Sequence, residues 1–332
     1  MTQPLIQVKN LAKHYPHAGG WFARAKGSTK AVDGLSFDIQ KGESFGLVGE
    51  SGCGKSTTGR AILNLTEPTS GSITFNGRAI FDSAQNVHLA GSQMRSLRRD
   101  MQIIFQDPYA SLNPRMSVGR IIAEGIKKHR IVHGKKAWEL AGDYLEKCGL
   151  SRDNLQRYPH EFSGGQRQRI GIARALALKP RFIVADEPIA ALDVSIQAQV
   201  LNLMSDLKEE LGLTYLFISH DLSIVRYFCD HIGVMYLGNL VEVGTKEDLF
   251  HNPLHPYTKA LLSSIPIDKP GQRKERIQLN GDIPSPSNPP SGCKFHTRCP
   301  YAVDHCRQIA PQMQQAEGEH LVSCHRWQEI TG

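Results

Sequence analysis

The residues Gly49 to Ser56 form a pattern that can bind phosphate. They read GESGCGKS and match the phosphate-loop pattern GxxxxGK[ST]. Glycines let the backbone curl so that successive N–H groups point at phosphate oxygens, and the N-terminus of the following helix adds a favourable dipole. Lys55 would neutralise charge on the β and γ phosphates, and Ser56 would offer its hydroxyl to Mg²⁺. The loop residues that we expect to contact the bound nucleotide are Gly49, Ser51, Gly52, Cys53, Gly54, Lys55, Ser56 and Thr57.

Two alternatives accompany this interpretation. The pattern could be a chance glycine turn, but an apolar run precedes it and a predicted helix follows it, as a phosphate loop requires. Cys53, inside the loop, fits better as a small filler than as a reactive thiol.

Two adjacent carboxylates end the run RFIVADEP, which begins at Arg181. Asp186 suits a Mg²⁺ carboxylate, and Glu187 suits a group that orients and deprotonates the attacking water. Neighbouring side chains on an extended chain point in opposite directions, so the two roles require a turn after Asp186, which Pro188 makes plausible. The alternative, a charged strand end that faces solvent, is disfavoured beside a phosphate loop.

The segment FSGGQRQRIGIARAL, from Phe162 to Leu176, predicts a second anion site. Ser163, Gly164 and Gly165 precede a helix whose first turn can present a hydroxyl and free N–H groups to a γ-phosphate. A glycine pair before a basic helix is weak evidence alone. Together with the phosphate loop, it indicates a composite site built from two helix N-termini.

The surrounding pattern predicts an α/β fold that places these groups. Apolar runs and the hairpin-like SGSITFNG at Ser70 to Gly77 predict an antiparallel β lobe. FGLV runs from a strand into the phosphate loop, and RFIVAD and LTYLFISH end in polar residues, as expected for a parallel sheet with its site at the strand carboxyl ends. Helical spacing between Pro114 and His160 predicts a helical insertion.

Length and composition bound the organisation of the chain. With 332 residues, 40% of them hydrophobic, the chain can form one large domain and a smaller one. We expect a nucleotide-binding domain over 1–250, with a helical subdomain at about 108–165, and a loop-rich extension over 251–332. No signal peptide and no apolar run of about 18 residues is present, so we expect no membrane crossing. The net charge of +7 suits an anionic partner without selecting one.

Four of the seven cysteines gather in the last forty residues. In a chain without an export signal, this clustering favours metal or cluster ligation over disulfides. Four thiolates can hold Zn²⁺ or an iron–sulfur cluster, and unligated thiols are the plain alternative. His296, His305 and His325 lie nearby as possible substitutes, although surface histidines are the ordinary expectation. The expected ligands are Cys293, Cys299, Cys306 and Cys324.

The order of these motifs closely resembles the ATPase subunits of ABC transporters over residues 4 to 250. That order comprises the phosphate loop, QDP at Gln106, SGGQ at Ser163, the strand that ends in Asp186 and Glu187, ALD at Ala191 to Asp193, and SHD with His220. The resemblance implies a P-loop NTPase fold with an antiparallel lobe and a helical subdomain. One departure is Ala190, where a serine is common before ALD.

The resemblance also implies roles for single residues. Glu187 would be the catalytic base, His220 would contact the γ-phosphate, and Gln106 would sense the γ-phosphate, Mg²⁺ and the permease. Mg²⁺ would be held by Ser56, Gln106 and Asp186. The signature residues would contact the nucleotide of a partner subunit, and Asp193 would lie at the dimer seam; these signature residues are Ser163, Gly164, Gly165 and Gln166.

Tyr15, in the sequence HYP, stands where the family places an aromatic ring against adenine. Stacking on a flat base is physically reasonable for tyrosine. A buried core position is the alternative for a lone tyrosine.

Two further segments resemble the oligopeptide, dipeptide and nickel importer branch of the family. They are QDPYASLNPRMSVG, from Gln106 to Gly119, and NPLHPYTKALLSSIP, from Asn252 to Pro266, which a proline-rich stretch and the cysteines follow. The branch implies a second, unlike ATPase subunit, two membrane permease subunits and an extracytoplasmic substrate-binding protein. It also implies a peripheral position on the cytoplasmic face of the plasma membrane, and it favours a [4Fe–4S] cluster over Zn²⁺.

The sequence therefore predicts an ATP-hydrolysing subunit that powers an importer of peptides, nickel or related small solutes. One rival is an ABC ATPase that acts on nucleic acid or the ribosome. Such proteins usually carry tandem ATPase domains or long coiled-coil insertions, and this chain shows neither, so we expect no nucleic-acid partner. Another rival is a regulatory subunit without turnover, against which Lys55, Glu187 and His220 argue.

Overall fold

The computed structural model describes residues 3–17, 27–89, 91–265 and 277–330. The chain divides into two compact units. Unit 1 comprises 1–40, 44–88 and 219–332, and unit 2 comprises 41–43 and 89–218. Both units draw on stretches that are far apart in the sequence, so neither is a simple half of the chain.

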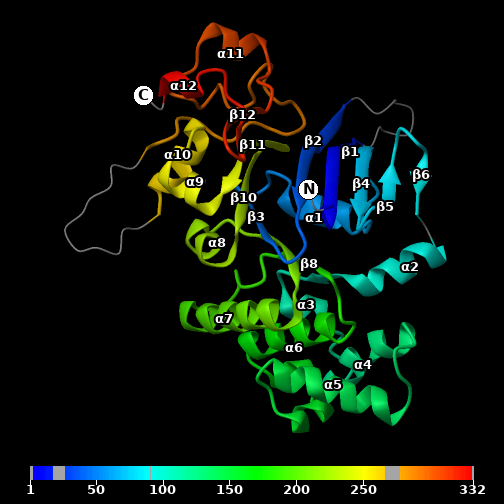
Figure 1. Ribbon diagram of the computed structural model, residues 1–332. Coiled ribbons are helices and arrows are strands. Elements are labelled where there is room, and N and C mark those ends of the chain that lie inside the picture. The colour runs from blue at the N-terminus through cyan, green and yellow to red at the C-terminus, as the bar shows by residue number, and fades with distance from the viewer. Residues whose placement is uncertain (1–2, 18–26, 90, 266–276, 331–332) are drawn as a thin grey trace. The chain divides into compact units, whose positions relative to one another are not determined.

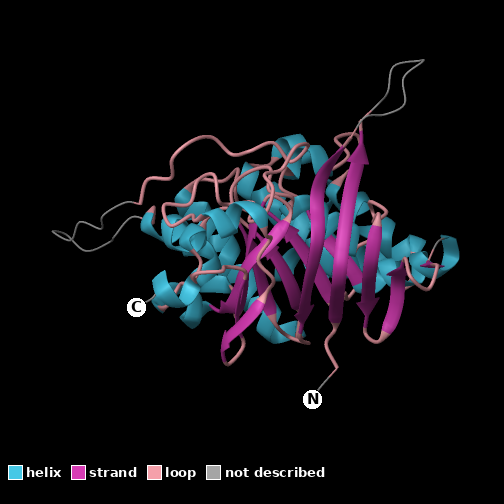
Figure 2. Ribbon diagram, turned by 90° about the horizontal axis from the view of Figure 1, so that it is seen from above, coloured by secondary structure: helices cyan, strands magenta, loops and turns pink. Residues whose placement is uncertain are grey.

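An antiparallel sheet in unit 1 has the strand order β2-β1-β4-β5-β6. Figure 2 shows its long strands side by side. A two-residue turn joins β4 to β5, because Asn76 and Gly77 both adopt positive φ, 47° and 77°, as tight hairpins require. The antiparallel lobe expected from SGSITFNG is confirmed. The strands are β1 (Ile6–Pro16), β2 (Ser28–Ile39), β4 (Ser70–Phe75), β5 (Arg78–Asp82) and β6 (Val87–His88).

A second set of strands in unit 1 has the order β12-β13-β11-β10-β3. The strands β3 and β10 are parallel, and every residue of β3 is buried, which explains why its sequence is a continuous apolar run. The strands are β3 (Ser44–Val48), β10 (His231–Tyr236), β11 (Asn239–Thr245), β12 (Gln314–Glu317) and β13 (His320–Val322). The helices of unit 1 are α1 (Lys55–Ile62), α8 (Leu222–Phe228), α9 (Lys246–His251), α10 (Pro256–Ser263), α11 (Asp304–Gln308) and α12 (Trp327–Ile330).

The described part of the C-terminal tail contains strands that its proline and glycine content does not predict. Its strand β13 pairs with β11, and β12 pairs with β13. Glu242 of β11 is fully buried, and its carboxylate accepts hydrogen bonds from the N–H groups of Leu254 and His255 at 2.7 and 2.9 Å. His320 Nε2 lies 2.8 Å from the same carboxylate. A buried carboxylate is tolerated when partners surround it in this way, so Glu242 ties the tail to the sheet.

Unit 2 contains the parallel strands β7 (Met101–Ile104), β8 (Phe182–Asp186) and β9 (Thr214–Ile218), in the order β9-β8-β7. Figure 1 shows α6 lying between α7 and α5. The helical insertion expected between Pro114 and His160 is confirmed, because α4 and α5 fall within it and bury their apolar faces. The helices are α2 (Gly91–Asp100), α3 (Pro108–Ser111), α4 (Val118–Lys128), α5 (Lys135–Lys147), α6 (Gly164–Leu176) and α7 (Val194–Leu211), with single 3₁₀ turns at Arg152–Gln156 and Pro159–Glu161.

Across the described residues, no helix combines the length and the apolar character that a membrane span requires.

Candidate functional site

The phosphate loop connects β3 to α1 inside unit 1, and two of its glycines are required by close contacts. Gly49 has φ 148°, and a Cβ at this position would lie 2.1 Å from the carbonyl oxygen of Met235. Gly54, the residue before α1, has φ 109°, and its Cβ would lie 2.0 Å from the carbonyl oxygen of Ala31. No side chain fits at either distance, so the tight packing of the loop against its neighbours depends on glycine.

Lys55, the first residue of α1, is 5% exposed. Its ammonium group donates hydrogen bonds to the carbonyl oxygens of Gly49 at 2.7 Å and Glu50 at 3.1 Å, so the cation lies inside the curl of the loop. Cys53 is also buried, and burial raises the pKa of its thiol. A thiol with a raised pKa is a poor nucleophile at neutral pH, which supports its interpretation as a filler.

The segment that carries His220 runs beside the end of β3. The N–H of Ser219 donates to the carbonyl oxygen of Leu47 at 3.2 Å, two residues before the loop begins. Asp221 caps α8 by accepting hydrogen bonds from the N–H groups of Ser223 and Ile224. His220, between these anchored residues, is exposed. Within unit 1, the structure therefore places His220 in a fixed loop at the strand end that feeds the phosphate loop.

Tyr15 lies near the end of β1 and is 40% exposed, which excludes a core position. The ammonium group of Lys13 lies 4.9 Å from the centre of its ring, a cation–π distance. The ring is thus partly exposed and lies beside a cation.

In unit 2, the chain turns between the two adjacent carboxylates. Asp186 ends β8 and is 2% exposed, whereas Glu187 adopts φ 47° and is partly exposed. A positive φ is strained for glutamate and is typical of functional sites. The N–H of Glu187 donates to the carbonyl oxygen of Ile218 at 3.0 Å, which holds the turn. The turn that the sequence required after Asp186 is present, and the two carboxylates occupy different environments.

Gln106 and Glu187 meet although 81 residues separate them. The side-chain amide of Gln106 donates to the carboxylate of Glu187 at 2.9 Å. The two residues follow β7 and β8, which are neighbouring parallel strands, so both project from the same sheet edge. The carboxylate expected to activate water is thus oriented by the glutamine expected to sense the nucleotide.

Ser163 caps α6 through a reciprocal pair of hydrogen bonds. Its hydroxyl accepts from the N–H of Gln166 at 3.3 Å, and its own N–H donates to the side-chain oxygen of Gln166 at 3.0 Å. A Cβ on Gly165 would lie 2.3 Å from Ile196 Cγ2, so this glycine lets α6 pack on α7. A Cβ on Gly164 would meet only Leu192 Cδ2, at 3.4 Å. A methyl group therefore fits at Gly164 within this unit, whereas it would clash at Gly165.

Asp193 is exposed and caps α7. Its carboxylate accepts from the N–H of Ile196 at 3.1 Å and from the hydroxyl of Ser195 at 2.9 Å. The hydrogen bond from Ile196 lowers the pKa of Asp193, so the carboxylate stays ionised at the start of the helix. Ala190, at the position where the family often has serine, is exposed as well.

Sequence reasoning missed three residues at the phosphate loop. The hydroxyl of Tyr257 accepts a hydrogen bond from the N–H of Glu50 at 2.9 Å, and Arg298 forms two hydrogen bonds with the Glu50 carboxylate. Tyr257 and Arg298 lie 207 and 248 residues further along the chain. No local sequence pattern predicts these contacts, because only tertiary packing brings the segments together.

The four tail cysteines line one small cavity of about 20 Å³ together with His296 and His325. All seven cysteines of the chain are free thiols. Burial raises the pKa of Cys293 to about 12 and that of Cys324 to about 11, so both thiols are protonated at neutral pH. Within the described part of the chain, no group of three or more His, Cys, Asp or Glu residues is arranged to hold a metal ion. The four cysteine thiols are therefore of the type that binds metal, but they are not arranged as a coordinated metal site.

Comparison with known proteins agrees with the motif order. The ABC transporter family model matches residues 32–190, and the model of the oligopeptide/dipeptide transporter C-terminal region matches 241–306. The oligopeptide transport ATP-binding protein AppF of Bacillus subtilis is 50% identical over 97% of this chain and 97% of its own. The putative oligopeptide transport ATP-binding protein YkfD of the same organism is 55% identical over 97% and 95%.

Solved structures identify the fold. A dimeric ATP-binding cassette, MJ0796, bound to ADP and Pi, is 28% identical, with a TM-score of 0.63 over 73% of this chain and 98% of that chain. This likeness confirms the predicted fold class, an α/β nucleotide-binding cassette with an antiparallel lobe and a helical part. With relatives of this identity along almost its whole length, the chain belongs to the ATP-binding proteins of ABC transporters, in the oligopeptide and dipeptide branch.

Proposed function

We propose that this chain binds and hydrolyses ATP to power the import of peptides through a membrane permease. The observation that carries the proposal is the identity of 50–55% to oligopeptide transport ATP-binding proteins along 97% of the chain, the C-terminal region included. Similarity confined to the ATPase motifs would support any ABC ATPase. Similarity that extends through the tail supports the peptide branch.

The contacts within each unit support a separate role for each site residue. The loop with Lys55 binds the terminal phosphates, and Tyr15 stacks on adenine. Glu187, oriented by Gln106, accepts a proton from the attacking water, while His220 contacts the γ-phosphate. Ser56, Gln106 and Asp186 would hold Mg²⁺, which when bound neutralises charge on the phosphates.

The partners follow from the same proposal. The chain pairs with a second ATPase subunit, so that the Ser163 helix terminus of this chain closes over nucleotide bound by the partner, with Asp193 at the seam. Two permease subunits and an extracytoplasmic substrate-binding protein complete the assembly, and the chain lies peripherally on the cytoplasmic face of the membrane. Gly164 is partly exposed at the N-terminus of α6, and among the described residues a Cβ there would meet only Leu192, at 3.4 Å, which supports this crossed arrangement.

Gly164→Ala tests the crossed arrangement. The added methyl fits inside this chain but projects where a partner's phosphate would approach, so we expect ATP hydrolysis and peptide uptake to fall about tenfold. The assembly is purified from membranes, its chains are identified by mass, and uptake of a labelled peptide is followed in vesicles. Photolabelling with an azido-ATP should decrease on the partner ATPase and persist on this chain.

Gly171→Ala is the matched control. It adds the same methyl to the same helix, and a Cβ there meets nothing within 4 Å, so activity should stay near that of the wild type. Loss of labelling on this chain instead of its partner would contradict the crossed site. A purified assembly that contains no permease, or in which peptide fails to stimulate hydrolysis, would contradict the importer assignment.

We further propose that Cys293, Cys299, Cys306 and Cys324 hold a [4Fe–4S] cluster, with Zn²⁺ as the alternative. Support comes from the four thiols that share one cavity and from the absence of disulfides among them. Thiolate is the form that binds metal, so binding would release the protons that burial now retains. A cluster there would cross-link the tail.

Metal analysis after anaerobic purification distinguishes these possibilities. A cluster predicts about four iron atoms per chain and a broad visible absorption, and zinc predicts about one ion without colour. Cys299→Ser should lower the metal content, whereas Cys229→Ala, at a buried cysteine outside the cavity, should not. A folded tail without bound metal in the wild type would refute both versions.

A further inference from the structure

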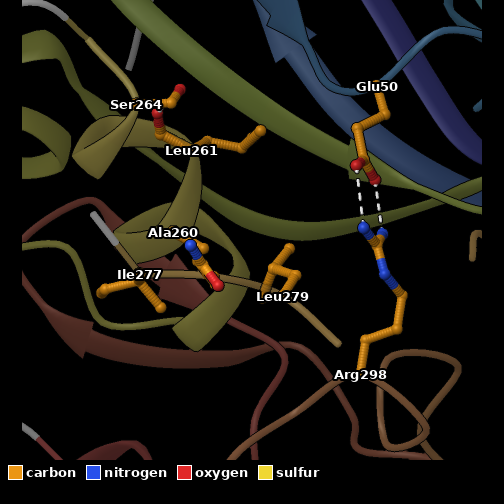
Figure 3. A pocket seen from close by; sticks show the side chains of 8 residues that line it. Glu50, Ala260, Leu261, Ser264, Ile277, Leu279 and Arg298 are labelled. Carbon is orange, nitrogen blue, oxygen red and sulfur yellow. Dashed lines mark hydrogen bonds and ion pairs between the residues drawn. The ribbon is translucent and has the colours of Figure 1, made fainter. Parts of the chain in front are cut away.

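Glu50, the second residue of the phosphate loop, is held from outside the loop by the C-terminal part of the chain. Its N–H donates to the hydroxyl of Tyr257 in α10 at 2.9 Å. Its carboxylate accepts two hydrogen bonds from the guanidinium of Arg298, at 2.7 and 3.0 Å. Figure 3 shows the fork of Arg298 facing both carboxylate oxygens. A paired contact of this kind fixes orientation as well as distance.

The turn that carries Arg298 lies beside a cluster of buried aromatic rings. Arg298 is 9% exposed, and its backbone N–H donates to the carbonyl oxygen of Phe295 at 3.0 Å. The ring of Phe295 packs against those of Tyr236 and Tyr257, with centroids 5.2 and 5.4 Å apart. The guanidinium carbon lies 6.0 Å from the centre of the Tyr236 ring. The burial of Arg298 beside this cluster limits the freedom of its side chain, and the planar fork matches the Glu50 carboxylate.

On its other side, Glu50 contacts the interior of the phosphate loop. Its carbonyl oxygen accepts hydrogen bonds from the ammonium of Lys55 at 3.1 Å and from the N–H of Cys53 at 3.3 Å. A single residue thus joins the phosphate-binding lysine to the tail. A shift of Glu50 would be transmitted to Lys55, because they share this hydrogen bond.

Glu50 also places a negative charge in a loop that binds anions. An uncompensated carboxylate there would repel a triphosphate and weaken its binding. Arg298 cancels that charge and holds the carboxylate on the outer side of the loop. The ion pair lines a cavity of about 430 Å³ together with Leu261 and Ser264, so it is only partly removed from solvent (Figure 3). Raised salt should therefore weaken it in part.

We propose that Arg298 is a positioning residue of the ATP site, through which the C-terminal extension sets the affinity of the phosphate loop for MgATP. The inference rests on the proposed function, because it deepens the account of the same site. The extension then has a role in nucleotide binding. Its Arg298 neutralises the carboxylate of Glu50, which would otherwise repel the phosphates.

The test measures steady-state ATP hydrolysis by the purified wild-type assembly and by assemblies that carry a variant of this chain. The variants are Arg298→Leu, Arg298→Lys and the double variant Glu50→Gln/Arg298→Leu. We expect Arg298→Leu to raise KM for ATP about tenfold with a smaller change in kcat. Arg298→Lys keeps the positive charge but loses the two-pronged guanidinium, so its KM for ATP should lie between those of the wild type and Arg298→Leu. The double variant should regain most of the lost affinity, because neither partner is left as an uncompensated charge.

A matched control is Arg307→Leu. This arginine belongs to the same extension, is 63% exposed and has its nearest carboxylate, Asp304, at 3.8 Å, so KM should not change. If Arg298→Leu merely unfolded the extension, the double variant would be equally impaired, and that result would overturn the proposal. A folded Arg298→Leu variant with KM within about twofold of the wild type would overturn it as well.

The proposal and the function on which it rests fail in different ways. An assembly whose wild-type chain binds no MgATP, measured by titration with a fluorescent ATP analogue before any variant is made, refutes the proposed function. Wild-type binding and hydrolysis together with variants that do not change KM refute only the role of Arg298.

Discussion

Glu187→Gln should leave MgATP binding intact and lower ATP hydrolysis by on the order of a hundredfold or more, the scale of losing a catalytic base. Glutamine keeps the shape of glutamate and still offers an oxygen to the amide of Gln106, so the 2.9 Å contact can persist. What it loses is the capacity to accept a proton from water. Nucleotide affinity and single-turnover hydrolysis, measured on the same preparation, separate the two effects.

The reference for this variant is Glu139→Gln, at an exposed glutamate of α5 that forms an ion pair with Lys135 at 3.7 Å. It makes the same chemical change in the same unit and should leave hydrolysis unaltered. Near-normal turnover by Glu187→Gln would show that another group activates the water. A parallel loss of nucleotide affinity would show that Glu187 acts in binding instead of chemistry.

Lys55→Ala should abolish the first step, because it removes the cation from inside the phosphate loop. Affinity for MgATP should fall by about a hundredfold, the scale of truncating one partner of a buried charged interaction. The carbonyl oxygens of Gly49 and Glu50 also lose a donor, so the loop itself loosens. Alanine is a strong helix former and should preserve α1, which circular dichroism can verify.

Lys41→Ala is the control for lost positive charge, since Lys41 is exposed and precedes β3. Titration with a fluorescent ATP analogue should give this control the affinity of the wild type. Unchanged affinity in Lys55→Ala would argue against the loop as the phosphate site. The two principal variants thus fail at different steps, one before nucleotide is bound and one after.

Short-range chemistry accounts for the features of the site that the sequence predicted well. A phosphate loop depends on glycines and a lysine within eight positions, and a helix N-cap depends on a serine at the start of the helix. Both features can therefore be recognised from residues that are close together in the sequence. The turn after Asp186 was likewise predicted because two adjacent carboxylates on a straight strand could not share a site. The parallel strands and the antiparallel lobe followed from apolar runs and a hairpin turn.

Tertiary structure alone decided which distant residues meet. The pairing of Gln106 with Glu187, the burial of Glu242 among its three partners, and the fork of Arg298 on Glu50 join residues between 12 and 248 positions apart. The composition of the tail predicted a loop-rich extension. Periodicity cannot reveal that the carboxylate of Glu242 will accept hydrogen bonds from the backbone of Leu254 and His255. Nor can it reveal that Arg298 will pair with a residue of the phosphate loop. The sequence by itself determined the chemistry and the family, since those depend on residue types at fixed local spacing. The connection between tail and phosphate loop required the fold, since it depends on how separate elements pack in space.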